Sequence, residues 1–218
     1  AGVIDLSLRG RIRVSGSEAT MFLNGLITND MKTLAENRWM PAAFPTVQGR
    51  LIGAVRVARG KDSFLIDTDA ESHEAVLKTI SRFTLAGDFR VTDLIGETAL
   101  FSIQGKRAGD VIEKVFAIAI SDLPRNGLAE LERQNTAVTI IRATHTAEDG
   151  FDIVIDSAHA VAAREALDVV AVVREEHLRP QPRSGQLLLP GRSAAEHRAA
   201  AGRPGRAPRG RAPARSRG

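Results

Sequence analysis

The sequence predicts an α+β fold in which short helices pack on one face of antiparallel sheets. Two observations lead to this class. First, a unit of strand, turn and amphipathic helix recurs along the chain, recognised where alternating apolar residues give way to apolar residues at helical spacing. Second, strands follow one another through short turns at Gln48-Gly49 and at Gly60-Lys61-Asp62, which is typical of a meander. Hairpins interspersed with helices favour the α+β class.

The first unit, GRIRVSGSEATMFLNGLITND, begins at Gly10. Two apolar residues alternate with arginines over residues 11–14, which predicts a half-buried strand. Gly16 turns the chain, and Ser15 or Ser17 is expected to cap the helix that follows. One face of this helix is apolar, formed by Ala19, Phe22, Leu23 and Leu26.

The unit recurs in three later segments. A strand at Phe64–Ile66 is followed by an acidic cap near Asp69 and by a helix that is expected to bury Val76, Leu77, Ile80 and Phe83. ALFSIQGKRAGDVIEKVF repeats the unit, with Gly105 in the place that Gly16 holds in the first. FDIVIDSAHAVAAREAL repeats it again, with Ser157 as the expected helix cap. FRVTDL and TAVTIIRA predict further strands.

Charge is divided unevenly along the 218 residues, whose formal net charge is +4. From Arg174 onward, eleven arginines face three glutamates, so this part carries +8 and residues 1–173 carry −4. All phenylalanines and lysines and the single tryptophan lie at or before Phe151, so the first part has a globular composition. We therefore predict a folded region at residues 1–170 and a disordered, Arg/Pro/Gly/Ala-rich tail at residues 171–218.

The composition excludes several classes of function. The chain has no cysteine, which excludes disulfides, thiolate catalysis and cysteine-based metal ligation within it. The five histidines include no pair at i, i+4, so no metal site is predicted. No apolar run approaches the roughly 20 residues that span a bilayer, so we expect a soluble, cytoplasmic protein without a membrane partner.

The segment Arg198–Gly218 has two interpretations. Twenty of its 21 residues are Arg, Ala, Pro or Gly. Unpaired arginines displace counterions from phosphates, so such an arm is able to grip nucleic acid. The same composition arises when a GC-rich gene is read in the wrong frame, whereas a natural basic arm usually mixes lysine and aromatic residues with arginine. We favour a lost reading frame near residues 170–180 and do not expect nucleic acid as a partner.

Two polar stretches are candidates for ligand-binding sites. The glycine-rich stretch GKRAG, Gly105–Gly109, has no hydroxyl after its lysine and lacks the second half of a phosphate loop, so we interpret it as a turn leading into a helix. RATHTAEDGFDIVI places Glu148 and Asp149 in a turn between two strands, where a carboxylate is able to face a ligand's amino groups, although acidic hairpin turns are common. No nucleophile motif is present and no catalytic residue is assigned.

Several stretches taken in order carry a family resemblance: GVIDLSLRGRIRVSGSEATMFLNGLITNDMKTL, GRLIGAVRV, SRFTLAGDFRVTD, FSIQGKRAGDVI and EDGFDIVI. Together they resemble the superfamily that joins the glycine-cleavage T-protein, an aminomethyltransferase, and the folate-binding YgfZ proteins. The resemblance covers residues 1 to about 168. Residues 64–91 are more similar to the YgfZ branch, because the T-protein usually has an Asn-Ala-x-Asn-like stretch where this chain has Asp67-Thr68-Asp69-Ala70.

The resemblance implies a T-protein/YgfZ-like fold that surrounds a tetrahydrofolate cavity, here without the small C-terminal barrel of YgfZ-like proteins. In the T-protein pattern TGEDGFE the first Glu holds the pterin ring. Glu148 occupies that position in TAEDGFD, where Ala147 replaces Gly and Asp152 replaces the second Glu. A carboxylate suits a pterin because it accepts two parallel N–H bonds. Asp67 is a second candidate carboxylate. Arg50 matches the family's Gly-Arg and is expected near the cavity, although a solvated strand residue is an equal interpretation.

The function that the resemblance implies is that of a YgfZ-type accessory protein. Such a protein binds tetrahydrofolate and supports the maturation of iron–sulfur enzymes, its possible partners, and thereby tRNA modification. The alternative is an aminomethyltransferase that transfers a one-carbon unit to tetrahydrofolate, and a second alternative is nucleic-acid binding through the tail. YgfZ-like proteins carry a Lys-Gly-Cys-Tyr-x-Gly-Gln-Glu motif, and this cysteine-free chain lacks it, so we expect the chain itself to be inactive in iron–sulfur support.

Overall fold

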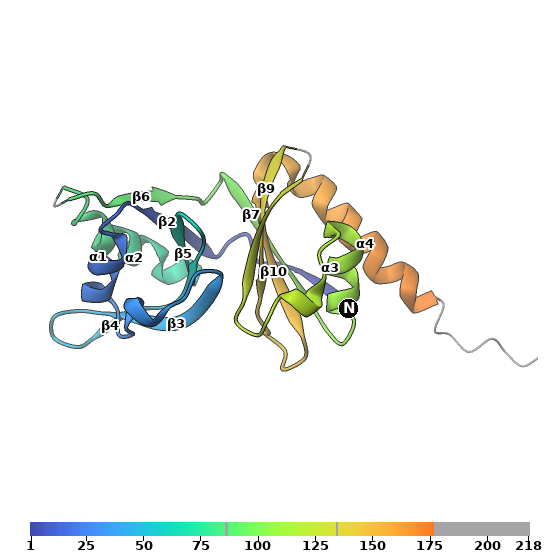
Figure 1. The fold of residues 1–218 in the computed structure, drawn as a ribbon, viewed down its shortest axis with the longest axis horizontal. Coiled ribbons are helices and arrows are strands. Elements are labelled where there is room, and N and C mark those ends of the chain that lie inside the picture. Colours follow the sequence, from blue (N-terminus) through green and yellow to red (C-terminus); the bar gives the residue numbers. More distant parts are fainter. Residues whose placement is uncertain (86, 134, 177–218) are drawn as a thin grey trace, which may run out of the picture. The chain divides into compact units, whose positions relative to one another are not determined.

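The α+β class is confirmed by the computed structural model, which describes residues 1–176 except residues 86 and 134. Two five-stranded antiparallel sheets, each with helices packed against it, make up this part of the chain (Figure 1). The predicted tail, residues 171–218, starts inside the last helix, α4 (Ala160–Glu176). Residues 177–218, and with them the arginine-rich segment considered for nucleic-acid binding, lie outside the described residues.

The first sheet and its helices come from the first half of the chain. In chain order the elements are β2 (Gly10–Ser15), α1 (Ala19–Leu26), η1 (Met31–Thr33), β3 (Arg38–Pro45), β4 (Leu51–Arg59), β5 (Ser63–Thr68), α2 (Ala70–Ser81) and β6 (Arg90–Asp93). The strand order in the sheet is β3-β4-β5-β2-β6. The two predicted turns join β3 to β4 and β4 to β5, and α1 and α2 follow β2 and β5 as the recurring pattern predicted.

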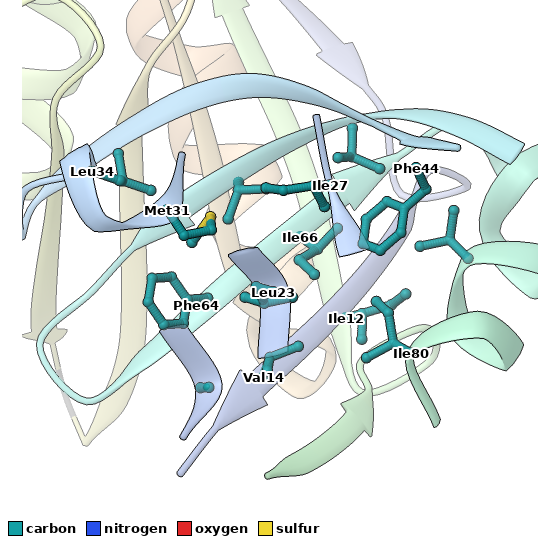
Figure 2. Close-up of a cluster of buried hydrophobic side chains, with 14 of the residues drawn as sticks. Ile12, Val14, Leu23, Ile27, Met31, Leu34, Phe44, Phe64, Ile66 and Ile80 are labelled. Carbon is teal, nitrogen blue, oxygen red and sulfur yellow. The ribbon is translucent and has the colours of Figure 1, made fainter. Parts of the chain in front are cut away.

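The core of this region forms where the apolar side chains of β2 meet the helices. Ile12 and Val14 alternate along β2 and are fully buried, and Leu23 of α1 lies in the same cluster (Figure 2). Phe44 of β3 and Ile80 of α2 belong to the same cluster and are among the other side chains labelled there (Figure 2). Because burial of one large apolar side chain contributes about 1.5–3 kcal/mol, this cluster holds the helices on the sheet.

The second sheet is formed mainly by the second half of the described chain. Its elements are β1 (Gly2–Asp5), β7 (Thr98–Gln104), α3 (Ala108–Phe116), η2 (Ile120–Asp122), β8 (Leu128–Arg133), β9 (Thr136–Arg142), β10 (Gly150–Asp156), η3 (Ser157–His159) and α4. The strand order is β1-β7-β10-β9-β8, and α3 and α4 pack against each other and against the sheet (Figure 1). Strands β1 and β8, at the two edges, were not predicted from the sequence.

Strand β10 is buried on both faces because it lies in the centre of this sheet. Phe151, Ile153 and Ile155 belong to the apolar cluster that also contains residues of α3 and α4. Asp152 lies on the opposite face by strand alternation, and its side chain is fully buried. A buried carboxylate in a central strand requires compensating partners, which Arg56 and His145 supply.

The helix caps differ from those predicted. The residue before α1 is Glu18, without a side-chain cap, and the Ser17 hydroxyl donates instead to Asp88 in the neighbouring chain segment. Asp69 precedes α2 as predicted, but its carboxylate pairs with an arginine rather than with the helix N–H groups. At the last unit, Asp156 and not Ser157 caps the first turn by accepting a hydrogen bond from Ala158 N. An ionised carboxylate is the stronger acceptor for an exposed helix N-terminus.

Candidate functional site

A cavity of about 370 Å³ lies where the start of β3 meets the turn between β9 and β10. It is lined by Trp39, by Arg125 and Asn126, and by most of the segment 142–150. Trp39 is fixed there by two hydrogen bonds, because its backbone N donates to Asn126 O (2.8 Å) and its indole Nε1 donates to Arg142 O (2.9 Å). The cavity therefore has one aromatic wall of fixed position and one wall formed by an acidic turn.

Glu148 is the predicted site residue that lines this cavity. It lies in the turn between β9 and β10, and its side chain is exposed. Among the residues that the structure describes, none forms a hydrogen bond or ion pair with its carboxylate. Gly105 lies beside it, since a Cβ at Gly105 would stand 3.5 Å from Glu148 Oε2. An ionised, unpartnered carboxylate at a cavity wall is available to accept hydrogen bonds from a ligand.

The turn that carries Glu148 contains a residue in an unfavourable backbone conformation. Ala147 has a φ of 64°, in the left-handed region that favours glycine. The T-protein pattern TGEDG has glycine at this position, whereas this chain has an alanine in the left-handed region. The conformation directs the next residue, Glu148, to the cavity.

Arg142 supplies the positive charge at the base of the acidic turn. Its guanidinium forms a two-pronged pair with Asp149, from Nε to Oδ1 at 3.1 Å and from Nη2 to Oδ2 at 2.8 Å. Its Nη1 donates to Leu123 O at 2.7 Å. The charge of Arg142 is thus paired with Asp149, and its remaining N–H group is bonded to the backbone. Glu148 is therefore the carboxylate of the turn that has no ion-pair partner among the described residues.

Asp67, predicted as a second ligand-binding carboxylate, is placed differently. It is only 4% exposed and is not among the described residues that line the cavity. Its two oxygens are held by two arginines: Arg9 Nε lies 2.8 Å from Oδ1 and Arg56 Nη2 lies 2.9 Å from Oδ2. Asp67 is therefore part of a buried ion network and not of the cavity wall.

The same network links the two sheets through Asp152. Arg56 Nη2 lies 2.6 Å from Asp152 Oδ2, so a guanidinium from β4 joins a carboxylate of β5 to one of β10. On its other side Asp152 accepts a hydrogen bond from His145 Nε2 at 3.0 Å. Burial by itself would raise the pKa of Asp152, but the hydrogen bond from His145 and the charge of Arg56 outweigh it, so the pKa is lowered from its ordinary 3.8.

Arg50 lies in the turn after β3 and is exposed. It is not among the described residues that line the cavity, and its backbone, not its side chain, pairs with Thr46. The sequence reasoning missed two residues of the site, Trp39 and Arg142. A signal for Arg142 is its position immediately before the turn, where antiparallel pairing places it opposite Phe151.

Two other classes of site find no support in residues 1–176, with residues 86 and 134 set aside. No group of three or more acidic or histidine side chains is arranged to hold a metal ion in this part of the chain. Likewise, none of its helices has the length and apolarity to cross a bilayer.

Two helix-covered antiparallel sheets, joined by a buried ion network and carrying a cavity with a carboxylate at its wall, define an α+β domain. The chain belongs to the family described as the GCVT N-terminal domain, whose pattern matches residues 1–179. The resemblance to the T-protein superfamily that the sequence motifs indicated is thereby confirmed at the level of the superfamily.

Relatives of known name support the same assignment. The chain is 28% identical over 169 residues to an aminomethyltransferase of Bacillus pumilus, a match that covers 77% of this chain and 46% of the relative. It is 30% identical over 173 residues to an aminomethyltransferase of Geobacillus thermodenitrificans, again covering 77% and 46%. The chain thus spans about half the length of the curated relatives it matches. These names fit the predicted alternative, aminomethyltransferase, better than the YgfZ-type function.

Solved structures show the same fold. The glycine cleavage system aminomethyltransferase T from Bartonella henselae superposes with a TM-score of 0.68 at 22% identity, covering 76% of this chain and 45% of that one. Heterotetrameric sarcosine oxidase from Corynebacterium sp. U-96 superposes with a TM-score of 0.54 at 15% identity, covering 78% and 86%. At these identities the likeness concerns the fold alone.

Proposed function

We propose that this chain forms the folate-binding part of an aminomethyltransferase-type protein, and that its cavity accepts the pterin ring of tetrahydrofolate. The observation that carries the proposal is the placement of Glu148. Its carboxylate is the uncompensated acceptor at a cavity wall, and it occupies the position that holds the pterin in the family pattern TGEDGFE.

The cavity suits a flat, amino-substituted ring in its size and chemistry. A volume of about 370 Å³ lies within the range of small-molecule sites, roughly 300–1,000 Å³. The pterin edge presents adjacent N–H groups, and a carboxylate accepts two such bonds in parallel, which is stronger than a pair of neutral contacts. Trp39 adds an aromatic wall. The geometry thus supplies both the orienting acceptor and the apolar surface that a pterin requires.

Transfer of a one-carbon unit is proposed as an activity of the aminomethyltransferase-type protein as a whole, and Glu148 alone does not perform it. That reaction needs the folate nitrogens and the aminomethyl group held in a defined geometry. Within the described residues, Asp67 is buried, is paired with two arginines and does not line the cavity, so no role in proton transfer is proposed for it. The described part therefore contributes binding and orientation. A YgfZ-type accessory role rests on the Asp67–Ala70 stretch, and iron–sulfur enzymes as partners have no support among the relatives.

Calorimetric titration with tetrahydrofolate tests the proposal. Glu148→Gln keeps the shape of the side chain and removes its charge, so it should weaken binding by the value of a charge-assisted bond, about 1.5–3 kcal/mol, which is roughly 10- to 150-fold in Kd. Glu71→Gln makes the same chemical change at an exposed position of α2, away from the cavity, and should leave Kd unchanged. Equal affinity of the Glu148 variant and the parent would refute the proposal.

A further inference from the structure

The turn that carries Glu148 is hydrogen-bonded to a buried side chain that does not line the cavity. Residues 143–149 connect β9 to β10, and the carboxylate of Glu148 has no partner of its own among the described residues. Its position therefore depends on the backbone of the turn. What fixes that backbone also determines where the carboxylate points.

Gln104, the last residue of β7, contacts the turn at three points. Its Nε2 donates to Ala143 O at 3.1 Å, and its Oε1 accepts from His145 N at 3.0 Å and from Thr146 Oγ1 at 3.4 Å. The side chain is 5% exposed, so these bonds form away from water. Its Nε2 also donates to Ser102 Oγ at 2.8 Å, which fixes the orientation of the amide. One amide group thus satisfies both a carbonyl and an N–H of the turn.

Gly150 shows how closely the turn sits on this amide. A Cβ at Gly150 would overlap with the amide atoms of Gln104, so the residue that follows Asp149 packs directly on the amide. Gly105, next to Gln104 in the chain, donates its backbone N–H to Asp149 O at 2.9 Å. The C-terminal end of β7 therefore contacts both ends of the turn: Gln104 bonds to Ala143 and His145, and Gly105 bonds to Asp149.

We infer that Gln104 is a positioning residue for ligand binding: its amide holds the 143–149 turn in the conformation that presents Glu148 to the cavity. The inference rests on the proposed function for the identity of the ligand. Gln104 is not among the described residues that line the cavity, so it acts through the turn and not by touching the ligand.

The donor half of the amide can be removed without changing its shape. Gln104→Glu keeps an acceptor for His145 N but replaces the Nε2 donor by an oxygen that faces Ala143 O. Because a buried carboxyl group has a raised pKa, acidification protonates it while exposed carboxylates remain ionised, and the protonated group donates again. Tetrahydrofolate affinity of this variant should fall about 10-fold at pH 8, the value of one or two hydrogen bonds, and recover toward the parent value near pH 6.

Two further variants separate positioning from general destabilisation. Gln104→Ala has no group to titrate, so its affinity should be low at both pH values. Gln48→Glu makes the matched change in the exposed β3–β4 turn and should behave as the parent at both. Recovery of affinity in the Gln104→Glu variant on acidification, absent in Gln104→Ala, would show that the effect depends on the hydrogen-bond donor at this position.

Hydrogen exchange gives a readout that needs no folate. In the parent, the His145 amide is protected by Gln104 Oε1, so Gln104→Ala should accelerate exchange in residues 144–149 by roughly 2- to 10-fold, the value of one lost hydrogen bond, while peptides from β2 and β5 keep their protection. If the parent fails to bind tetrahydrofolate but this acceleration occurs, the proposed function is wrong and the positioning role stands. Unchanged exchange in residues 144–149 of Gln104→Ala overturns the inference, as does a Gln104→Glu variant that binds tetrahydrofolate as tightly as the parent at pH 8. If Gln104→Ala loses protection throughout the chain, the pH comparison on Gln104→Glu decides.

Discussion

Asp152→Asn should destabilise the protein far more than removal of an ordinary surface charge. The Asp152 carboxylate is fully buried and accepts from Arg56 at 2.6 Å and from His145 at 3.0 Å. Asparagine has nearly the same shape, but it is uncharged, and it places an NH₂ group or a weaker acceptor against these donors. The change therefore leaves Arg56 with one carboxylate partner, Asp67, instead of two.

The magnitude follows from that remaining partner. Removing one member of a buried ion pair costs about 3–5 kcal/mol, because the other charge stays buried without compensation. Arg56 keeps Asp67 at 2.9 Å, so the loss should lie at the lower end, about 3 kcal/mol. Total stabilities of about 5–15 kcal/mol leave such a variant folded and measurable.

Urea unfolding at pH 7 measures the loss, with circular dichroism and tryptophan fluorescence as probes. The single tryptophan, Trp39, is a local reporter because the Arg56 guanidinium lies 5.4 Å from its ring centre. Asp168→Asn is the control, since Asp168 pairs with Arg164 one helical turn away at a partly exposed site and should cost at most about 0.5 kcal/mol. If Asp152→Asn lowers the free energy of unfolding by less than about 1 kcal/mol, the ion pair between Asp152 and Arg56 behaves as a solvent-exposed pair, and the inference from its burial is wrong.

Two further predictions concern pH and backbone strain. Because the pKa of Asp152 is lowered in the folded state, the contribution of its carboxylate to stability is fully present above the unfolded pKa of about 3.9 and is lost as the pH falls through the folded pKa. Urea titrations from pH 6 to pH 2.5 should therefore show that the difference in free energy of unfolding between the parent and Asp152→Asn shrinks on acidification. A constant difference would contradict this sign. Ala147→Gly should stabilise the protein by about 0.5–1 kcal/mol, since it removes a left-handed alanine worth about 1–2 kcal/mol and adds about 0.5–1 kcal/mol of chain entropy; a lower urea midpoint would show that the strain argued from its φ of 64° is absent.

Local patterns in the sequence predict most of the elements because each depends on neighbouring residues. The apolar alternation of Ile12 and Val14 and the helical spacing of Ala19 and Leu23 correspond to buried positions of β2 and α1. The edge strands β1 and β8 were not predicted, whereas the edge strands β3 and β6 of the other sheet were, because the Gln48-Gly49 turn marks β3 and apolar residues alternate in FRVTDL. The caps were wrong where a distant partner competed, as when Ser17 bonds to Asp88.

In the candidate site, only contacts within one hairpin are predictable from the sequence. The β4–β5 register places Arg56 directly opposite Asp67, so a prediction of register from the turn at residues 60–62 would have revealed that Asp67 is paired. Nothing local predicts that Asp152, from the other sheet, approaches the same guanidinium. Glu148 is proposed as a site residue through the resemblance, because an acidic turn by itself is indistinguishable from an ordinary hairpin turn.

Glu148 and Asp152 lie four residues apart and have opposite roles because of where β10 begins. Glu148 precedes the strand and remains unpaired at the cavity, whereas Asp152 lies within it, where it is paired with Arg56 and hydrogen-bonded to His145. His145 is the residue that contacts both systems, since its ring binds Asp152 and its backbone N–H binds Gln104. If the Gln104 amide holds the turn, loss of the Asp152 charge lowers the free energy of unfolding and leaves folate affinity intact. If the ring of His145 holds the turn instead, both quantities fall together in Asp152→Asn, so one variant measured in two assays distinguishes a turn fixed through its backbone from one fixed through the buried charges.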